Sequence, residues 1–473
     1  MKNFLLLLVA GMLSGYAVAQ AELSSFNATG SGYSTTTLTD YQCLGVNPAN
    51  LGWKRNNNSM NLGFFEFAGS IYSEPLTKKE IMNDLWGNPI TLNDAQKLDA
   101  AKKFEGTRIF GSASLMSVGF SYQDEKLGGF AFNIRERFVW NSILNKNAAN
   151  FLYLGYNDPY FDSLAVDNGD TVGYATNPIY ASNLYNGTEQ QFIVFREFNI
   201  GWGRQIVNND NFTFYLGVGI KYILGYGMTQ YYQENNGGSI TGYSALSPAF
   251  KVDYNTPTPS RIDGDGYKKV GSGFGFDIGT TFEFYKKKIR VSIAVVDIGS
   301  ITWDGNVYKG NNGRVWKINT EGIDNYNIFQ QGQLIDSDNY PGDPDEWEGI
   351  QDQKLKLATT MRGGANFKIN EEFEAGFDVI IPFRPEMPGS FLAPVYGIGG
   401  KYNPAGWVDI SLGVVTGGKF GTNIPLGFTF YPVKKENNTW AVGIATRDVK
   451  TLFSNNNPTV SAAFGFLRFS FGQ

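Results

Sequence analysis

One stretch of the chain, residues 212–228, alternates between apolar and small or polar side chains over an unusual length. Every even position from Phe212 to Met228 is apolar, whereas the odd positions hold four glycines, a threonine, a tyrosine, an isoleucine and a lysine. Alternation with a period of two indicates a β-strand with one apolar face. Strands in soluble proteins usually span about 5–6 residues. A strand this long, apolar on one face and small or polar on the other, is typical of a membrane-spanning β-barrel.

Similar alternating segments recur along the chain, and together they predict a closed antiparallel transmembrane β-barrel of about 14 strands, an all-β fold. The predicted strands lie near residues 59–73, 107–123, 128–142, 192–207, 211–231, 271–285, 288–303, 354–368, 371–383, 393–402, 406–417, 422–432, 438–448 and 459–472.

The connections support the same fold. Long connections at 74–106, 143–191, 232–270 and 304–353 alternate with turns of a few residues. Bacterial barrels have short periplasmic turns and longer extracellular loops. We therefore expect an outer-membrane protein in contact with lipid, with both termini in the periplasm.

The N-terminus predicts export. Met1-Lys2-Asn3 precedes an apolar run and the small-residue site Ala17-Val18-Ala19, which together are typical of a signal peptide over residues 1–19. Residues 20–58 lack strand alternation, and we predict that they form a hatch or plug before the barrel at 59–473. The alternative is a disordered periplasmic tail.

Composition argues against several classes of function. The sequence has no histidine and one cysteine, which removes Ser-His-Asp triads, histidine-ligated metals and intrachain disulfides. We expect a protein that is not an enzyme and has no cofactor or metal. A net charge of −5 gives no indication of nucleic-acid binding.

Charged residues at inward-facing strand positions are predicted to line the lumen. Buried charges usually pair, so structural ion pairs are the first interpretation and a polar translocation path the second. Inward glycines such as Gly217 and Gly443 leave room for a plug. Glu136 and Arg196 fall on the apolar face of their strands and imply a bulge or a rim position. The predicted lumen charges are Arg135, Arg137, Glu197, Lys221, Asp277, Arg290, Arg362, Glu374, Asp378, Asp409, Arg447 and Arg468.

Two acidic stretches, Asp263 to Gly266 and Asp336 to Glu348, contain oxygen ligands that could hold calcium. Neither has the ligand spacing of an EF-hand, so solvated loops are the favoured interpretation. Two helices are predicted in the first long connection, at 77–86 and 93–104, the second capped by Asn93.

The last strand alternates aromatic residues up to Phe469 and Phe471. Such a strand closes the barrel, and its aromatic end is where barrel insertion machinery usually binds. We predict that Phe469 and Phe471 form an insertion signal.

Short motifs carry a family resemblance. Asn47-Pro48-Ala49, after a signal peptide and before the barrel, resembles the hatch of FadL-like (FadL/TodX-type) transporters of hydrophobic compounds, and a similar start occurs in Bacteroidota type IX secretion barrels. The stretches 296–303, 443–448 and 465–471 resemble the Bacteroidota DUF5723 barrels. The resemblance implies an outer-membrane barrel and, by analogy, passage of hydrophobic molecules past a hatch.

Three functions follow as hypotheses. The first is passive uptake of hydrophobic small molecules, with an apolar pocket built from the connections 74–106 and 143–191. The second is an accessory or docking barrel of a secretion or surface-assembly complex. An outer-membrane enzyme is the third, and the missing histidine weighs against it. The residues expected in the pocket are Leu85, Trp86, Phe151, Leu152, Tyr153, Leu154, Tyr160 and Phe161.

Overall fold

The computed structural model describes residues 25–53, 58–87, 90–167, 169–233, 240–252, 254, 256–285, 287–326, 347–435 and 437–472. The predicted signal peptide, the first residues of the predicted plug and the acidic residues Asp336 to Glu346 lie outside these ranges.

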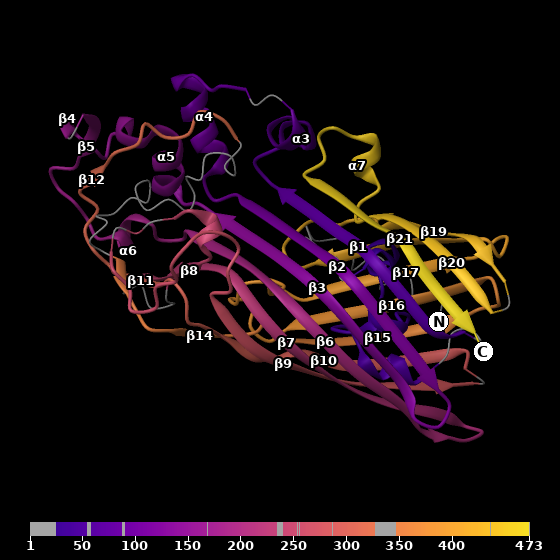
Figure 1. Ribbon diagram of the computed structural model, residues 1–473. Helices are drawn as coiled ribbons and strands as arrows, with labels where there is room; N and C mark the ends of the chain where they lie inside the picture. The colour runs from indigo at the N-terminus through magenta and orange to yellow at the C-terminus, as the bar shows by residue number, and fades with distance from the viewer. Residues whose placement is uncertain are drawn as a thin grey trace.

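Fourteen antiparallel strands of the described chain close into one barrel, because β1 pairs with β2 on one side and with β21 on the other. Figure 1 shows the strands running obliquely between two ends. The predicted fold is confirmed. The barrel strands are β1 (Asn58–Ser73), β2 (Arg108–Asp124), β3 (Gly128–Ile143), β6 (Glu189–Asn208), β7 (Phe212–Gln233), β9 (Gly271–Phe284), β10 (Ile289–Trp303), β15 (Thr360–Lys368), β16 (Phe373–Pro382), β17 (Val395–Tyr402), β18 (Val408–Gly417), β19 (Leu426–Lys434), β20 (Asn438–Thr446) and β21 (Thr459–Gly472).

The two ends of the barrel differ. One end carries the tight turns between paired strands, such as β2 to β3 and β6 to β7, and β21 finishes there at Gly472. We call this the turn end. The other end carries the long connections, and we call it the loop end. The barrel strands from β1 to β10 are longer than most of the barrel strands that follow. The loop end therefore rises higher on their side (Figure 1).

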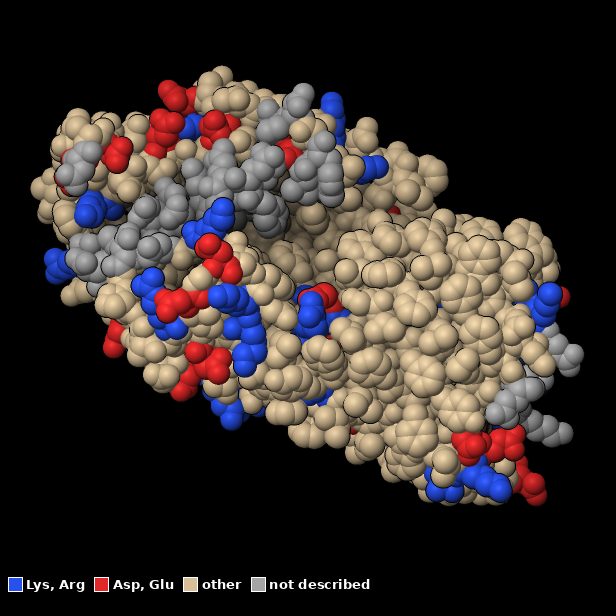
Figure 2. Space-filling view, in the orientation of Figure 1, with Lys and Arg blue, Asp and Glu red and all other residues tan. Residues whose placement is uncertain are grey.

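Strand β7 shows how the alternation is used. Val218, Ile220 and Tyr222 are exposed, whereas the residues between them are buried. The apolar face therefore points outward, and Figure 2 shows a broad band of uncharged surface over the strands. Such a band, on strands long enough to cross a bilayer, makes this an outer-membrane barrel.

The even positions of β7 stop facing outward beyond Leu224. The pairing of β6 with β7 skips Tyr226, where a β-bulge inserts one extra residue. The bulge reverses the faces, and Met228 is fully buried in an inner apolar cluster. Because a bulge leaves no reliable mark on an apolar pattern, the sequence does not reveal this reversal.

One predicted strand is divided. Residues 354–368 form β14 (Gln353–Lys356) and β15, separated by 357–359, and both pair with β10. Strand β10 has an irregularity between Val295 and Ile298, and the Thr359 hydroxyl donates to the Asp297 carbonyl oxygen there at 2.8 Å. The break between β14 and β15 therefore lies beside the bulge in β10.

The loop end has its own structure. The two predicted helices are confirmed as α3 (Lys78–Trp86) and α4 (Asp94–Phe104), each with a capping box, on Thr77 and Asn93. The other elements are α5 (Lys146–Leu154), η3 (Gly155–Asn157), β4 (Ser163–Asp167), β5 (Asp170–Tyr174), α6 (Ala181–Leu184), β8 (Ile240–Leu246), η4 (Pro248–Phe250), β11 (Val307–Gly310), β12 (Lys317–Ile318), β13 (Trp347–Gly349) and α7 (Lys450–Phe453). Within the described ranges, none of the helices is both long and apolar enough to cross a membrane.

Candidate functional site

The described N-terminal segment, residues 25–53, lies inside the barrel (Figure 1). It consists of α2 (Phe26–Ser31), η1 (Asp40–Cys43) and η2 (Pro48–Gly52), and nearly all of its residues are buried. It contacts inward-facing residues of strands around the wall, from β1 and β2 through β9 to β21. The segment therefore occupies part of the lumen toward the turn end.

The Asn47-Pro48-Ala49 motif begins η2. The Asn47 side chain accepts from the Ala49 backbone N–H at 3.1 Å, and its amide donates to Thr281 Oγ1 of β9 at 3.1 Å. Proline suits the first helical position because its ring pre-sets the backbone and it needs no N–H there. A Cβ atom on Gly217 would lie 2.2 Å from the Ala49 nitrogen, so only glycine allows this approach.

Hydrogen bonds to inward-facing carboxylates hold the rest of the segment. Asp378 Oδ2 on β16 accepts from the backbone N–H groups of Ser34 and Thr35 at 2.6 and 2.8 Å. Glu66 Oε1 on β1 accepts from the Tyr41 hydroxyl at 2.6 Å. These bonds join the segment to opposite parts of the wall.

Two inward-facing arginines also hold the segment, and we call the wall residues that hold it its seat. The Arg468 guanidinium on β21 forms an ion pair with Asp40. Arg290 on β10 stacks on Trp53, with 3.6 Å from the guanidinium carbon to the ring centroid, and pairs with Glu283 at 2.8 Å. The segment is thus fixed by charge and by stacking.

A network of buried ion pairs lies in the middle of the wall. Glu197 pairs with Arg135 at 2.9 Å and with Arg137 at 3.2 Å. Lys221 pairs with Asp277 at 3.0 Å and with Asp297. Arg137 and Asp297 lie 3.6 Å apart and join the two groups. The charges of this network are paired with each other.

Asp297 belongs to this network but was not among the predicted lumen charges. Its φ of 61° lies in the left-handed region, and its backbone N–H donates to Asp277 Oδ1 at 2.9 Å. The bulge turns its side chain inward. A signal existed in the sequence, because an aspartate at 297 interrupts the apolar positions 289, 291, 293 and 295.

The other predicted lumen charges lie apart from the network. Arg362 is buried over the Phe391 ring, and Glu374 is half-buried near the turn end. Asp409 forms an ion pair with Lys401 and accepts from the Tyr431 hydroxyl at 2.7 Å. Arg447, near the loop end, is fully buried and donates to Ser70 Oγ at 3.2 Å.

Three further predicted features can be placed. Phe469 and Phe471 lie on β21 opposite Leu62 and Met60 of β1. Glu136 and Arg196 form a partly exposed ion pair of 2.5 Å directly opposite each other on β3 and β6, with Arg196 over the Tyr226 ring of the bulge. Asp263 lies in an exposed loop, paired with Arg261.

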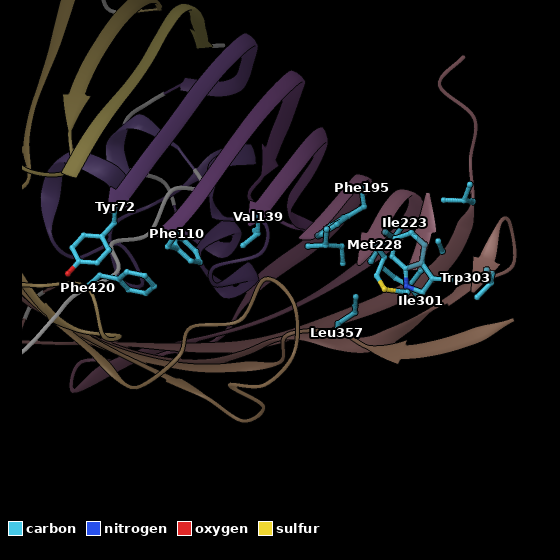
Figure 3. Close-up of a cluster of buried hydrophobic side chains, with 14 residues drawn as sticks. Tyr72, Phe110, Val139, Phe195, Ile223, Met228, Ile301, Trp303, Leu357 and Phe420 are labelled. Carbon is cyan, nitrogen blue, oxygen red and sulfur yellow. The ribbon is translucent and has the colours of Figure 1, made fainter. Parts of the chain in front are cut away.

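The inner wall changes character toward the loop end. Figure 3 shows side chains from several strands pointing into the barrel there. They are apolar and buried, and Trp303 of β10 is fully inaccessible. We call this set the apolar lining. It consists of Tyr72, Phe110, Val139, Ile193, Phe195, Ile223, Met228, Ala245, Val270, Ile301, Trp303, Val307, Leu357 and Phe420.

Three of the residues expected in a pocket of the first two long connections, namely Phe151, Tyr153 and Phe161, lie in packed clusters instead. Phe151 and Phe161 pack together with a ring-centroid distance of 5.0 Å, and Tyr153 packs on Phe104 at 5.1 Å. All four are buried, so they form packed cores of the loop region. The sequence could not tell a pocket from a core because both are apolar. The side chains of Leu85 and Trp86 lie outside the described residues.

Two cavities lie on either side of the seat of residues 25–53. One, of about 940 Å³, opens at the turn end and is lined by polar and charged residues that include Arg290, Asp409 and Arg468. The other, of about 20 Å³, lies between the ion-pair network and the apolar lining, under Pro388 and Gly389 of the connection from β16 to β17.

The cysteine Cys43 is fully buried in η1. Burial, followed by the nearby Asp40 carboxylate, raises the pKa of the Cys43 thiol well above its usual range. Because the thiolate is the reactive form, Cys43 is protected while the segment stays in place.

Comparison with known families identifies the chain. A family described as "Family of unknown function (DUF5723)" matches residues 48–435, which include most of the barrel strands and the Pro48-Ala49 part of the Asn47-Pro48-Ala49 motif. The chain belongs to the DUF5723 family. The predicted membership is confirmed. No curated protein matches the sequence.

Several solved barrels are similar to this DUF5723 protein. A TodX deltaS2S3 mutant, a monoaromatic hydrocarbon channel, is 9% identical with a TM-score of 0.49, covering 95% of this chain and 99% of its own. The Pseudomonas putida toluene transporter TodX is 10% identical, with a TM-score of 0.44 and coverages of 97% and 100%. A Pseudomonas aeruginosa FadL homologue is 11% identical, with a TM-score of 0.44 and coverages of 96% and 100%.

Proposed function

We propose that this protein is a plugged outer-membrane channel for the passive uptake of hydrophobic small molecules. The apolar lining carries the proposal. A water-filled barrel has a polar interior, whereas the loop-end half of this lumen presents buried apolar side chains from β1, β2, β3, β6, β7 and β10. Apolar contact is favourable by about 25 cal/mol per Å² of surface removed from water, so such a surface favours apolar molecules over ions.

Residues 25–53 act as the plug in this proposal, with the long connections outside the cell and the termini in the periplasm. The segment is held by Asp378 on β16 and by Glu66 and Arg468 on the neighbouring strands β1 and β21. The 20 Å³ cavity beside the apolar lining has room for about one water molecule, which needs about 10–15 Å³ of such space. Entry of a larger molecule therefore requires the connection from β16 to β17, which covers the cavity, to move.

Native mass spectrometry of the protein released from nanodiscs tests the uptake proposal. We expect a bound apolar molecule on the wild type, loss of that adduct in Ile223→Asn, and its retention in Val218→Asn. The two variants introduce the same amide in one strand, inside and outside the barrel respectively. A polar adduct, or an apolar adduct that Ile223→Asn does not weaken, contradicts the proposal.

Planar-bilayer recording tests the plug. The wild type should be nearly silent, and a variant lacking residues 25–53 should conduct, once heat-modifiable gel mobility shows that it forms a barrel. A large steady current through the wild type that the deletion leaves unchanged would contradict the plug.

Alkylation of Cys43 gives a second, independent measurement. A maleimide should label native protein slowly and unfolded protein completely. The control is the double variant Cys43→Ser/Thr39→Cys, because Thr39 is only half-buried and lines the 940 Å³ cavity. Equal labelling rates at positions 39 and 43 would mean that the segment does not stay seated.

A further inference from the structure

Strand β4 is the edge of a small sheet at the loop end. The sheet has the order β12–β5–β4, and β4 pairs with β5 along its whole length without a bulge. In the part of the chain that the structure describes, no residue pairs with the other edge of β4. Among the described residues, the backbone N–H and C=O groups along that edge therefore have no strand partner, as at any sheet edge that can accept another strand.

All five residues of β4 are exposed. Leu164 is 57% exposed and Val166 is 76% exposed, so the strand offers large aliphatic side chains as well as backbone groups. Figure 1 shows β4 at the outer extreme of the loop region, far from the turn end. A strand placed there is accessible to large molecules outside the barrel.

The surroundings of this edge are acidic. Asp162, Asp167 and Asp170 are exposed, and the sequence from 158 to 176 contains no lysine or arginine. The nearby cation Lys317 lies on β12, at the opposite edge of the sheet, where its ammonium group sits over the Trp316 ring at 4.8 Å. The edge therefore combines an aliphatic centre with uncompensated negative charge.

We propose that the free edge of β4 docks an extended segment of a partner protein, which adds a strand to the sheet. Main-chain hydrogen bonds supply affinity in this mode of recognition, and alternate side chains supply specificity. The complementary segment has two or three apolar residues at alternate positions and lysine or arginine at its ends. A second copy of β4 fits poorly, because pairing two such edges brings their aspartates together and like charges destabilise cross-strand pairs.

Selection from a random 12-residue peptide library displayed on phage tests this proposal. The target is the full chain in nanodiscs, with counter-selection against the double variant Leu164→Lys/Val166→Lys, which adds two cations to the edge. The matched control is Leu98→Lys/Leu452→Lys, the same kind of change at exposed aliphatic positions on α4 and α7. All three proteins are first compared by heat-modifiable gel mobility and circular dichroism.

We expect enriched peptides with alternating apolar residues and basic ends. A synthetic peptide of that sequence should bind the edge variant at least about tenfold more weakly, a loss of about 1.4 kcal/mol, and the control variant unchanged. Methylation of its backbone nitrogens on one edge should abolish binding. The proposal is overturned if no such pattern is enriched, if acidic peptides are enriched, or if the edge variant binds as the wild type does. Concentration-dependent self-association that only the edge variant loses would assign the edge to a second copy instead.

Discussion

The turn-end and loop-end halves of the lumen have opposite chemistry although the same strands build both. Toward the turn end, inward positions carry paired charges and hydrogen-bonding groups that hold residues 25–53. Toward the loop end lies the apolar lining, with the buried Arg447 guanidinium 5.8 Å from the ring centroid of its Phe420. The change occurs within two residues on the two strands that flank β6, from Lys221 to Ile223 on β7 and from Arg137 to Val139 on β3.

This boundary shows what each half requires of its side chains. Buried charges must pair, since an unpaired one costs several kcal/mol. In the polar half, the pairs Arg135–Glu197 and Lys221–Asp277 meet this need across neighbouring strands. The side chains of the apolar lining carry no charge that has to be paired. They are stabilised by contact between aliphatic and aromatic groups. Under the proposed function, a molecule without charge would contact the second half and leave the ion pairs of the first half intact.

Removing one charge should disturb the polar half most. Lys221→Met leaves Asp277 buried without its cation and Asp297 paired with Arg137 alone, and we expect a loss of about 3–5 kcal/mol in the free energy of unfolding. Ile223→Met, two residues further along the same face, should cost less than about 1.5 kcal/mol. Equilibrium unfolding in urea with phospholipid vesicles measures both, and similar losses would remove the contrast between the halves.

A substitution on the outer face of the barrel should have the next largest effect on the free energy of unfolding. Val218 is exposed on the apolar band, so Val218→Arg should cost about 2–4 kcal/mol if it lies near the middle of the membrane. Thr213→Ser, on the inner face of the same strand, should change stability little. Equal costs for the two variants in the same unfolding assay would contradict the inside and outside assignment.

The seat of the N-terminal segment should respond to a smaller change. Tyr41→Phe removes the hydroxyl that donates to Glu66, and a hydrogen bond to a charged group contributes about 1.5–3 kcal/mol. If the segment leaves its seat in a rapid equilibrium, Cys43 should be alkylated about tenfold to a hundredfold faster. As a control, Tyr431→Phe loses a comparable bond, to Asp409, outside the segment. An increase in that control as well would mean general loosening of the barrel.

The smallest effect is expected in the apolar lining. Ile301→Val removes one buried methylene group, with an expected cost of about 0.5–1.5 kcal/mol. If the lining binds the apolar molecule, the same change should weaken its adduct in native mass spectrometry without altering Cys43 alkylation. Faster alkylation would show that the two halves are coupled.

Much of the fold could be predicted from the sequence because it depends on local patterns. The alternation around Val218 and Ile220 determines a strand with a lipid-facing side, and the capping residues Thr77 and Asn93 determine where two helices begin. The order of long and short connections determines which strands pair. Each of these features depends on residues close together in the chain.

Only the tertiary structure decided which groups meet inside the barrel. Asp378 and Thr35 are 343 positions apart in the chain and share a hydrogen bond, and no local pattern records such a pair. The bulges at Tyr226 and Asp297 reverse faces that the alternation had assigned. The apolar half of the lumen was missed for the same reason, since inward residues such as Ile223 and Phe195 acquire a common role only when the barrel closes and places them on one surface.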